Sequence, residues 1–474
     1  MIEVEVQSDH PARFRRVIPR DRFREFREAG RRAAERLRGV TVWNVNSTER
    51  GGGVAEMLRC LLGYTRIAGL DARWLVIEGA PDFFEVTKRI HNRIHGSPGD
   101  GGPLDERARA VYDRVTEAAG HELAQRVAPG DVVLLHDPQT AGLAPRVRRL
   151  GATAVWRCHV GSDDPSPLAD EAWAFLCPFL LEAEAYVFSR REFVWSGLDS
   201  GRVQVIPPSI DAFSAKNRDL DGDEVRAILA ASGVVPAAAS LDGRPPLTSR
   251  ARMVEDLPVP PGAPVVTQVS RWDGLKDPMG VIEGFAAHVA RSSAAHLVVA
   301  GPSEDSVADD PEGVEVLRRC VEVRAALPPE VRARVHLACL PMDDADENAL
   351  IVNALQRYAD VVVQKSLAEG FGLTVAEAMW KARPVVASRV GGIQDQVDDG
   401  HNGLLIDDPA DLREFGQAVL VLLEQTERAH ALGLAARESV RDRFLAPRHL
   451  NQYADLLRQL VASPPAGAVE QAAT

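Results

Sequence analysis

The sequence predicts an α/β protein that is built from two parallel sheets. Short runs rich in Val and Ile alternate with longer segments of helical spacing, which is typical of strands that crossover helices cover on both faces. The chain has 474 residues, too many for one ordinary hydrophobic core, and this length indicates two domains of about 200 residues each. Several glycine-rich or polar motifs directly follow strand candidates, where ligands bind in open α/β sheets.

The strand candidates form two series, one in each half of the chain. The first series predicts strands at residues 41–46, 73–77, 131–135, 153–156, 185–188 and 203–206. The second predicts strands at 265–269, 296–300, 334–338, 360–364, 384–388 and 403–406. We therefore expect one Rossmann-like domain at residues 1–210 and another at 262–445.

The segments outside these series are read as a linker, a last helix and a tail. Residues 211–261 are rich in Asp, Pro, Ala and Ser and contain the breakers LDGRPPLTSR and LPVPPGAP, so we expect a domain linker with a surface insertion. At 446–462 an apolar stripe predicts a helix that packs back on the N-terminal domain. The tail at 463–474, SPPAGAVEQAAT, is expected to be disordered.

Composition excludes several classes of protein. The formal net charge of −13 argues against a nucleic-acid-binding surface, which would present a basic face. The five cysteines include no C-x-x-C pair, so we expect reduced thiols and not a disulfide framework or a zinc site. The N-terminus has no apolar signal core, and no run reaches the roughly 18 apolar residues of a membrane span. A cytoplasmic location is expected.

One stretch, residues 365–392, carries the strongest chemical signal. It places Glu369 in a turn before Gly370-Phe371-Gly372 and sets Glu377 inside a helix. Glycines at a helix start let phosphate approach free N–H groups, and the two carboxylates accept hydrogen bonds from sugar hydroxyls. Phosphate together with a polyol indicates a nucleotide sugar. An alternative is that Thr374 and Glu377 form a capping box, which would not explain Glu369 or the glycine turn.

Two further loops follow strand candidates. Residues Gly51-Gly52-Gly53 come after the first strand and could bring backbone N–H groups close to a diphosphate or a sugar, although plain loop flexibility is the alternative. The motif G-x-x-x-x-G-K-[ST] is lacking, so a P-loop is excluded. Arg271 and Lys276 follow strand 265–269. Fixed cations of this kind stabilise the charge that builds on a departing diphosphate, and two surface cations are the alternative.

These motifs resemble those of known enzymes. The stretch 365–392 resembles the E-x7-E signature of retaining glycosyltransferases of family 4, which have the GT-B fold of two Rossmann-like domains with parallel sheets facing a central cleft. Further segments are similar to trehalose glycosyltransferring synthases: LDARW, FFEVTK, HDPQ, WRCH, IPPSID, TQVSRWD and EGFGLTVAEAMWKARPVV. The resemblance covers roughly residues 40–460, and residues 236–255 form an insertion outside it.

The resemblance implies a retaining glucosyltransferase that makes α,α-trehalose reversibly from a nucleoside diphosphate glucose and glucose. It implies catalytic roles for Arg271, Lys276, Glu369 and His159, and acceptor contacts from Asp137 and Gln139. The implied donor-binding residues are Gly51, Gly52, Gly53, Phe371, Gly372, Leu373, Thr374 and Glu377. The partners would be a nucleotide sugar and a small sugar acceptor, and a homodimer is compatible with the sequence.

No essential metal or other cofactor is expected. The D-x-D spacings at 219–223 and 344–346 are read as part of the linker and as a helix start, where acidic residues suit the helix dipole. Three alternatives stay open: a retaining trehalose phosphorylase, a family 4 enzyme with another acceptor, and a sugar-nucleotide sensor without turnover. The nucleotide base, the acceptor and the oligomeric state are not decided by the sequence.

Overall fold

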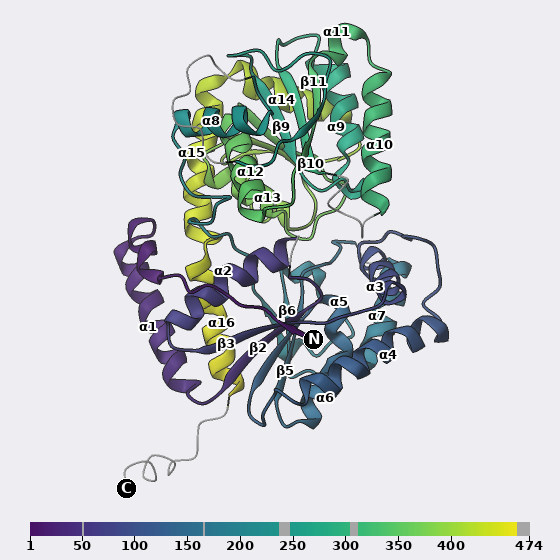
Figure 1. Ribbon diagram of the computed structural model, residues 1–474, viewed down its shortest axis with the longest axis vertical. Helices are drawn as coiled ribbons and strands as arrows, with labels where there is room; N and C mark the ends of the chain where they lie inside the picture. The colour runs from purple at the N-terminus through teal and green to yellow at the C-terminus, as the bar shows by residue number, and fades with distance from the viewer. Residues whose placement is uncertain (50–51, 165, 237–246, 304–310, 462–474) are drawn as a thin grey trace. The chain divides into compact units, whose positions relative to one another are not determined.

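The structure is a computed structural model that describes residues 1–49, 52–164, 166–236, 247–303 and 311–461. The chain divides into two compact units (Figure 1). The first unit consists of Met1–Ser209 together with Leu445–Thr474, and the second unit is Ile210–Phe444. Each unit has its own seven-stranded sheet.

The first unit's sheet has the strand order β1-β3-β2-β4-β5-β6-β7. Its strands are β1 (Ile2–Glu3), β2 (Thr41–Asn46), β3 (Asp71–Val76), β4 (Val132–His136), β5 (Thr153–Cys158), β6 (Ala185–Phe188) and β7 (Val203–Val205). Neighbouring strands pair in parallel except β1, which is antiparallel to β3. The first predicted series of strands is confirmed, with ends that shift by one or two residues. The two-residue strand β1 was not predicted.

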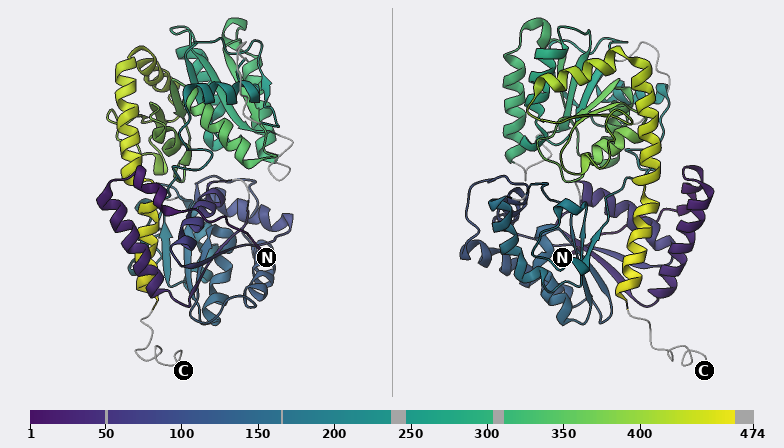
Figure 2. Two further views of the ribbon diagram at one scale, coloured as in Figure 1. Left: turned by 60° about the vertical axis from the view of Figure 1, so that its left-hand side comes forward. Right: turned by 180° about the vertical axis from the view of Figure 1, so that it is seen from behind.

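Helices cover both faces of this sheet (Figure 2). They are α1 (Arg20–Arg36), α2 (Gly53–Ile67), α3 (Pro81–Ile94), α4 (Glu106–Leu123), α5 (Asp137–Thr140), α6 (Ala144–Arg149), α7 (Pro167–Leu180) and α16 (Ala446–Leu460). On one face Trp156 and Tyr112 belong to the apolar core formed with α3, α4, α6 and α7. On the other face Leu457 of α16 packs in a cluster with Ala33 and Leu37, so the last helix completes the first unit's core.

The second unit's sheet has the order β14-β13-β12-β9-β10-β11-β8. Its strands are β8 (Arg252–Val254), β9 (Val265–Val269), β10 (His296–Pro302), β11 (Val335–Leu340), β12 (Val361–Gln364), β13 (Val385–Ser388) and β14 (Leu404–Ile406). All pairs are parallel except β8 with β11. The second predicted series is confirmed as well, and β8 was missed.

The helices of the second unit flank its sheet (Figure 1). They are α8 (Gly222–Ser232), α9 (Pro278–Gly284), α10 (Pro311–Ala325), α11 (Pro329–Arg332), α12 (Ala345–Tyr358), α13 (Leu373–Trp380), α14 (Leu412–Glu424) and α15 (Thr426–Arg443). Short turns of 3₁₀ or π-helix occur in both units. In the first unit they lie at Pro11–Arg16, Ala141–Leu143, Arg191–Phe193 and Ser200–Arg202, and in the second at Gly274–Lys276, Phe285–Val289 and Gly391–Ile393. Phe285 and Phe415 are fully buried in the core between the sheet and this helical layer.

The segment 211–261 is more than the expected linker. Asp221 and Glu224 form a capping box that starts α8, and Gly233 ends the helix in a left-handed conformation. This helix packs against α12, while β8 extends the sheet beside β11. The second unit therefore begins at Ile210 and not at 262. Residues 237–246, which are half of the predicted insertion at 236–255, and the tail at 463–474 lie outside the described residues.

Three smaller predictions concern the cysteines, the second D-x-D spacing and the membrane. The five cysteines are free thiols, of which Cys158, Cys320 and Cys339 are buried. Asp344 is the N-cap of α12 and accepts hydrogen bonds from two backbone N–H groups, which confirms that 344–346 is a helix start. Within the described ranges, no helix combines the length and the apolar character that a membrane crossing needs.

Candidate functional site

In the second unit two predicted site residues from distant motifs form an ion pair. Lys276 Nζ donates to Glu369 Oε2 over 2.7 Å, and their side chains are only 17% and 11% exposed. Ser366 Oγ donates to the same carboxylate oxygen over 3.3 Å. Lys276 follows β9 and Glu369 follows β12, and these strands are neighbours in the sheet. The sheet therefore brings together two motifs that lie 93 residues apart.

The loop that carries Lys276 is held from both of these strands. Gln268, on β9, donates from Nε2 to the Lys276 carbonyl over 2.9 Å. Asp277 has a left-handed backbone with φ of 46° and caps α9. Its carboxylate also accepts from the buried Lys365, which follows β12. Lys365 was not predicted, because nothing in its local sequence sets it apart from a surface lysine.

Arg271 does not join the Lys276–Glu369 pair. Its side chain is 53% exposed and its Nη2 lies 3.3 Å from Asp273 Oδ2. Asp273 also accepts from the Leu275 N–H at 2.8 Å and so fixes the start of the short turn that presents Lys276. The structure thus brings together one of the two predicted cations and the first predicted carboxylate.

A pair of glycines fits the Glu369 turn closely. A side chain at Gly391 would place its Cβ 1.7 Å from the Glu369 carbonyl oxygen, and the backbone there has φ of 48°. The Gly392 N–H donates to the Gly370 carbonyl over 3.2 Å. Gln396 donates from its side chain to the Phe371 carbonyl. The turn is therefore held by backbone contact that only glycine permits at 391.

Helix α13 begins beside Glu369. Gly372 is its N-cap, with φ of 84° and no side-chain capping bond, and a Cβ there would lie 3.3 Å from Glu369 Cγ. Leu373 and Thr374 are partly exposed at the helix start, where N–H groups lack intrahelical partners. The Phe371 ring is buried against Phe444, so contact from Phe371 to a ligand would come from its backbone.

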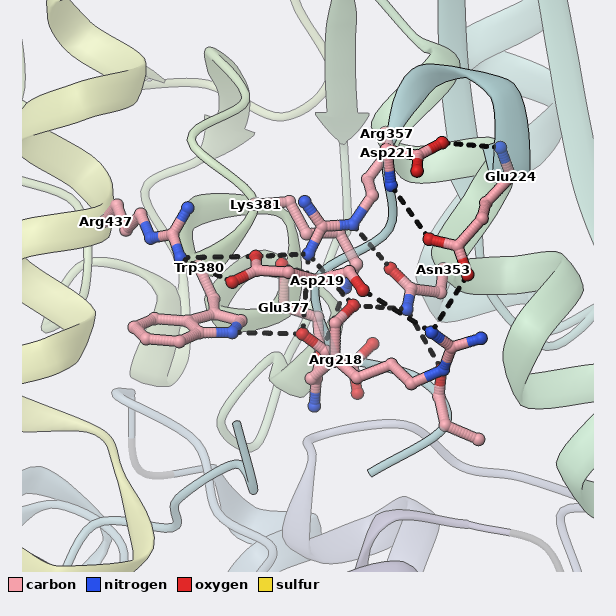
Figure 3. Close-up of polar contacts among 12 residues, drawn as sticks. Arg218, Asp219, Asp221, Glu224, Asn353, Arg357, Glu377, Trp380, Lys381 and Arg437 are labelled. Carbon is pink, nitrogen blue, oxygen red and sulfur yellow. Dashed lines mark hydrogen bonds and ion pairs between the residues drawn. The ribbon is translucent and has the colours of Figure 1, made fainter. Parts of the chain in front are cut away.

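The capping-box alternative for Thr374 and Glu377 is wrong. Thr374 Oγ1 donates to Gln364 Oε1 over 3.1 Å instead of capping the helix. Glu377 is buried, and its Oε1 lies 3.9 Å from Lys216 Nζ. Figure 3 shows Glu377 among the polar side chains around Arg218 and Asp219. The Glu377 carboxylate therefore does not cap the start of α13.

In the first unit, three polar side chains that end with His159 contact one another in a row. His159 Nε2 lies 3.2 Å from His136 Nδ1, and His136 Nε2 lies 3.2 Å from Asn44 Oδ1. Burial and the nearby Arg157 guanidinium lower the pKa of His136 to about 3. The same causes, with burial the larger, hold the pKa of His159 well below its ordinary value. Both rings are therefore neutral hydrogen-bonding groups at neutral pH.

The predicted acceptor residues lie next to this row of side chains. Asp137 has a left-handed backbone with φ of 64°, and its Oδ1 accepts from the His159 N–H over 2.7 Å. Burial raises the pKa of Asp137 to about 7. Gln139 is partly exposed in the first turn of α5. Asp137 thus fixes the backbone of His159, a contact that its position at a strand end did not reveal.

The triple-glycine loop is described in part. Gly52 is the N-cap of α2 with φ of 82°, and Gly53 is the first helical residue. Gly51 lies outside the described residues. Asn44 and His136 were not predicted as site residues, although His136 ends β4 and belongs to the motif HDPQ, whereas Asn44 lies within β2. Within the described part of the chain, no three His, Cys, Asp or Glu side chains gather as they would to bind a metal ion.

Two protein families match separate parts of the chain. The family described as "Trehalose synthase, N-terminal domain" matches residues 44–195. The family described as "Glycosyl transferases group 1" matches residues 345–439. The first match contains the hydrogen-bonded residues Asn44, His136 and His159. The second contains Glu369 and Glu377.

Relatives and solved structures extend these matches over nearly the whole chain. The trehalose synthase of Rubrobacter xylanophilus is 36% identical over 452 residues, which are 95% of this chain and 97% of the relative. That of Pyrococcus horikoshii is 35% identical over 90% of this chain and 92% of the relative. The sucrose-phosphate synthase of Thermosynechococcus elongatus matches with a TM-score of 0.61 at 18% identity, covering 90% of this chain and all of that one. These findings confirm the GT-B fold, and the chain belongs to the trehalose synthase family of glycosyltransferases.

Proposed function

We propose that the enzyme transfers glucose from a nucleoside diphosphate glucose to free glucose, with retention, and so forms α,α-trehalose. The observation that carries this proposal is the Lys276–Glu369 ion pair beside the glycine-capped start of α13. It combines a cation and helix N–H groups for a diphosphate with a carboxylate for sugar hydroxyls. The 36% identity to a trehalose synthase supports trehalose as the product.

The proposed chemistry needs no protein nucleophile. The bond between the glucose anomeric carbon and the diphosphate oxygen breaks, and the acceptor hydroxyl bonds to that carbon on the same face. The acceptor proton passes to the departing phosphate oxygen. Lys276 and Arg271 neutralise the growing phosphate charge, Glu369 accepts from donor sugar hydroxyls, and Glu377 accepts from ribose hydroxyls. His159 lies beside the donor sugar, and Asp137 and Gln139 contact the acceptor glucose.

A product assay tests the proposal. Purified enzyme is incubated with UDP-, ADP- or GDP-glucose and D-glucose, and the disaccharide linkage is determined by NMR. Formation of α,α-1,1-linked trehalose is expected, and excess nucleoside diphosphate should drive trehalose cleavage. A different linkage, or transfer only to another acceptor, would contradict the acceptor assignment. Glucose 1-phosphate release from trehalose and inorganic phosphate alone would identify a phosphorylase, and donor binding without turnover a sensor.

The proposed reaction proceeds without a metal cofactor. Lys276, Arg271 and the α13 N–H groups supply the positive charge that a diphosphate needs. We therefore expect turnover to survive dialysis against EDTA. Complete loss that magnesium or manganese restores would contradict this expectation, whereas mild stimulation by magnesium would reflect its binding to the free nucleotide product.

A further inference from the structure

Residues Ala215–Asp219, which we call the anchored segment, are held by side chains of α12 and by residues at the end of α13 (Figure 3). Asn353 donates to the Ala215 carbonyl over 3.0 Å and to the Arg218 carbonyl over 2.9 Å. Trp380 Nε1 donates to the Asn217 carbonyl over 3.1 Å. Three backbone carbonyls of one short segment are thus bound by side chains of the second unit.

The side chain of Asn217 strengthens this attachment. Its Oδ1 accepts from Lys381 Nζ over 3.0 Å, and both residues are buried. Lys381 Nζ also donates to the Glu377 carbonyl over 3.1 Å. Burial lowers the pKa of Lys381, and the neighbouring Glu377 carboxylate partly offsets that effect. The anchored segment is therefore fixed directly against the helix that carries Glu377.

This attachment gives Lys216 a fixed place in the candidate donor site. Lys216 Nζ lies 3.9 Å from Glu377 Oε1, and the two side chains are 18% and 4% exposed. A charge pair removed from water in this way seldom adds net stability, because desolvation offsets the attraction. Its position at the predicted ribose carboxylate therefore favours a role in binding over a role in folding.

The charges around the anchored segment support this conclusion. Two arginines, from α12 and α15, share the carboxylate of Asp219. Glu377 lies near Lys216, and its negative charge favours the charged form of Lys381. Glu377 therefore lies near two lysines, and its carboxylate can accept hydrogen bonds from hydroxyl groups such as those of a ribose.

We propose that Lys216 binds the nucleotide sugar: together with Glu377 it forms hydrogen bonds with the ribose of the nucleotide. Glu377 accepts hydrogen bonds from the vicinal ribose hydroxyls, and Lys216 donates to one of their oxygens. A donor and an acceptor side by side match a hydroxyl, which both donates and accepts. This inference rests on the proposed function, since it assumes that a nucleotide occupies the site beside α13.

The test measures nucleotide affinity by isothermal titration calorimetry. UDP, ADP and GDP and their 2′-deoxy and 3′-deoxy forms are titrated into the wild-type enzyme, Lys216→Met and Lys216→Arg. Wild type should prefer the ribose form over at least one deoxy form by about tenfold or more, since hydrogen bonds to buried charged groups are strong. Lys216→Met should lose most of that preference and bind the deoxy form unchanged, and Lys216→Arg should recover part of it.

Arg218→Met is the matched control. It removes a cation from the same segment, but the Arg218 side chain is 43% exposed and pairs with Glu224, so ribose preference should stay as in wild type. If Lys216→Met binds each nucleotide with the same affinity as the wild-type enzyme, the inference about Lys216 is overturned and the proposed function is not. Failure of wild type to bind any of these nucleotides would overturn the proposed function with it. An equal loss of preference in Arg218→Met would show that the segment's fold matters and not Lys216.

Discussion

At the scale of single residues, the structure separates predicted site residues into two groups. Lys276 and Glu369 meet in a 2.7 Å ion pair, whereas Arg271 pairs with its neighbour Asp273. The first result was predictable, because both motifs follow strands and the carboxyl ends of parallel strands meet at one edge of a sheet. Lys216 was not predictable, because its contact with Glu377 depends on how the anchored segment packs.

Replacing Lys276 with Ala should lower kcat by about a hundredfold or more, since the lost cation serves charge that grows in the transition state. Arg271→Ala should also lower kcat. Steady-state kinetics with nucleoside diphosphate glucose and glucose measures both. Arg318→Ala, which removes an exposed arginine that pairs with Glu315 on α10, should keep full activity. Near-normal turnover in both site variants would remove them from the mechanism.

Glu377→Gln should weaken nucleotide binding by about tenfold, since a neutral acceptor makes weaker hydrogen bonds than a carboxylate. Glu377 does not cap α13, so the melting temperature should change by no more than about 4 °C. Calorimetric titration with the preferred nucleoside diphosphate and thermal melting measure the two quantities. Unchanged affinity together with a large loss of stability would assign Glu377 to folding instead.

At the scale of elements, pattern and packing explain what the sequence could predict. Strands buried on both faces read as continuous Val- and Ile-rich runs, so both parallel series were found. β1 and β8 are two and three residues long and pair antiparallel at sheet edges. Both strands contain a charged residue and lack the Val-, Leu- or Ile-rich run that revealed the three-residue strands β7 and β14. The Asp- and Pro-rich composition of 211–261 likewise hid α8 and β8, because composition does not report pairing with a distant strand.

The glycine turn makes an element-scale prediction. Gly391→Ala should lower both stability and turnover strongly, since its Cβ would overlap the Glu369 carbonyl oxygen at 1.7 Å. Gly400→Ala is the matched control: it has φ of 72° but no atom within 4 Å of the added Cβ, so it should cost only about 1–2 kcal/mol of backbone strain. Thermal melting and kcat measure the difference. Equal behaviour of the two variants would show that strain, and not overlap, decides the effect.

At the scale of the whole molecule, buried histidines in both units make stability depend on pH. Burial is the main cause that lowers the pKa of His136 to about 3 and of His296 to about 4, and it holds the pKa values of His159 and His449 well below the ordinary value. Unfolded histidine has a pKa of about 6.5. Their contribution is therefore fully present above pH 6.5 and is lost as the pH falls toward 4.

We expect the melting temperature to fall steadily between pH 7 and pH 4.5. Asp137 opposes the trend, because burial raises its pKa to about 7 and its folded protonated form gains as the pH falls. His296→Asn should make the decline shallower, since that variant has one fewer ring to protonate. Thermal melting across this range compares the two proteins. A parallel decline in both would exclude His296 as a contributor.

The first unit is assembled from two distant stretches of chain, residues 1–209 and 445–474, with the second unit between them. During synthesis the ribosome therefore releases the entire second unit before α16 exists. Until then, Ala33 and Leu37 lack the packing that Leu457 supplies. Because domains fold as units while the chain emerges, the second unit can mature first. The cluster around Ala33 and Leu37, which belongs to the earliest part of the chain to be made, is thus among the last to reach its native packing.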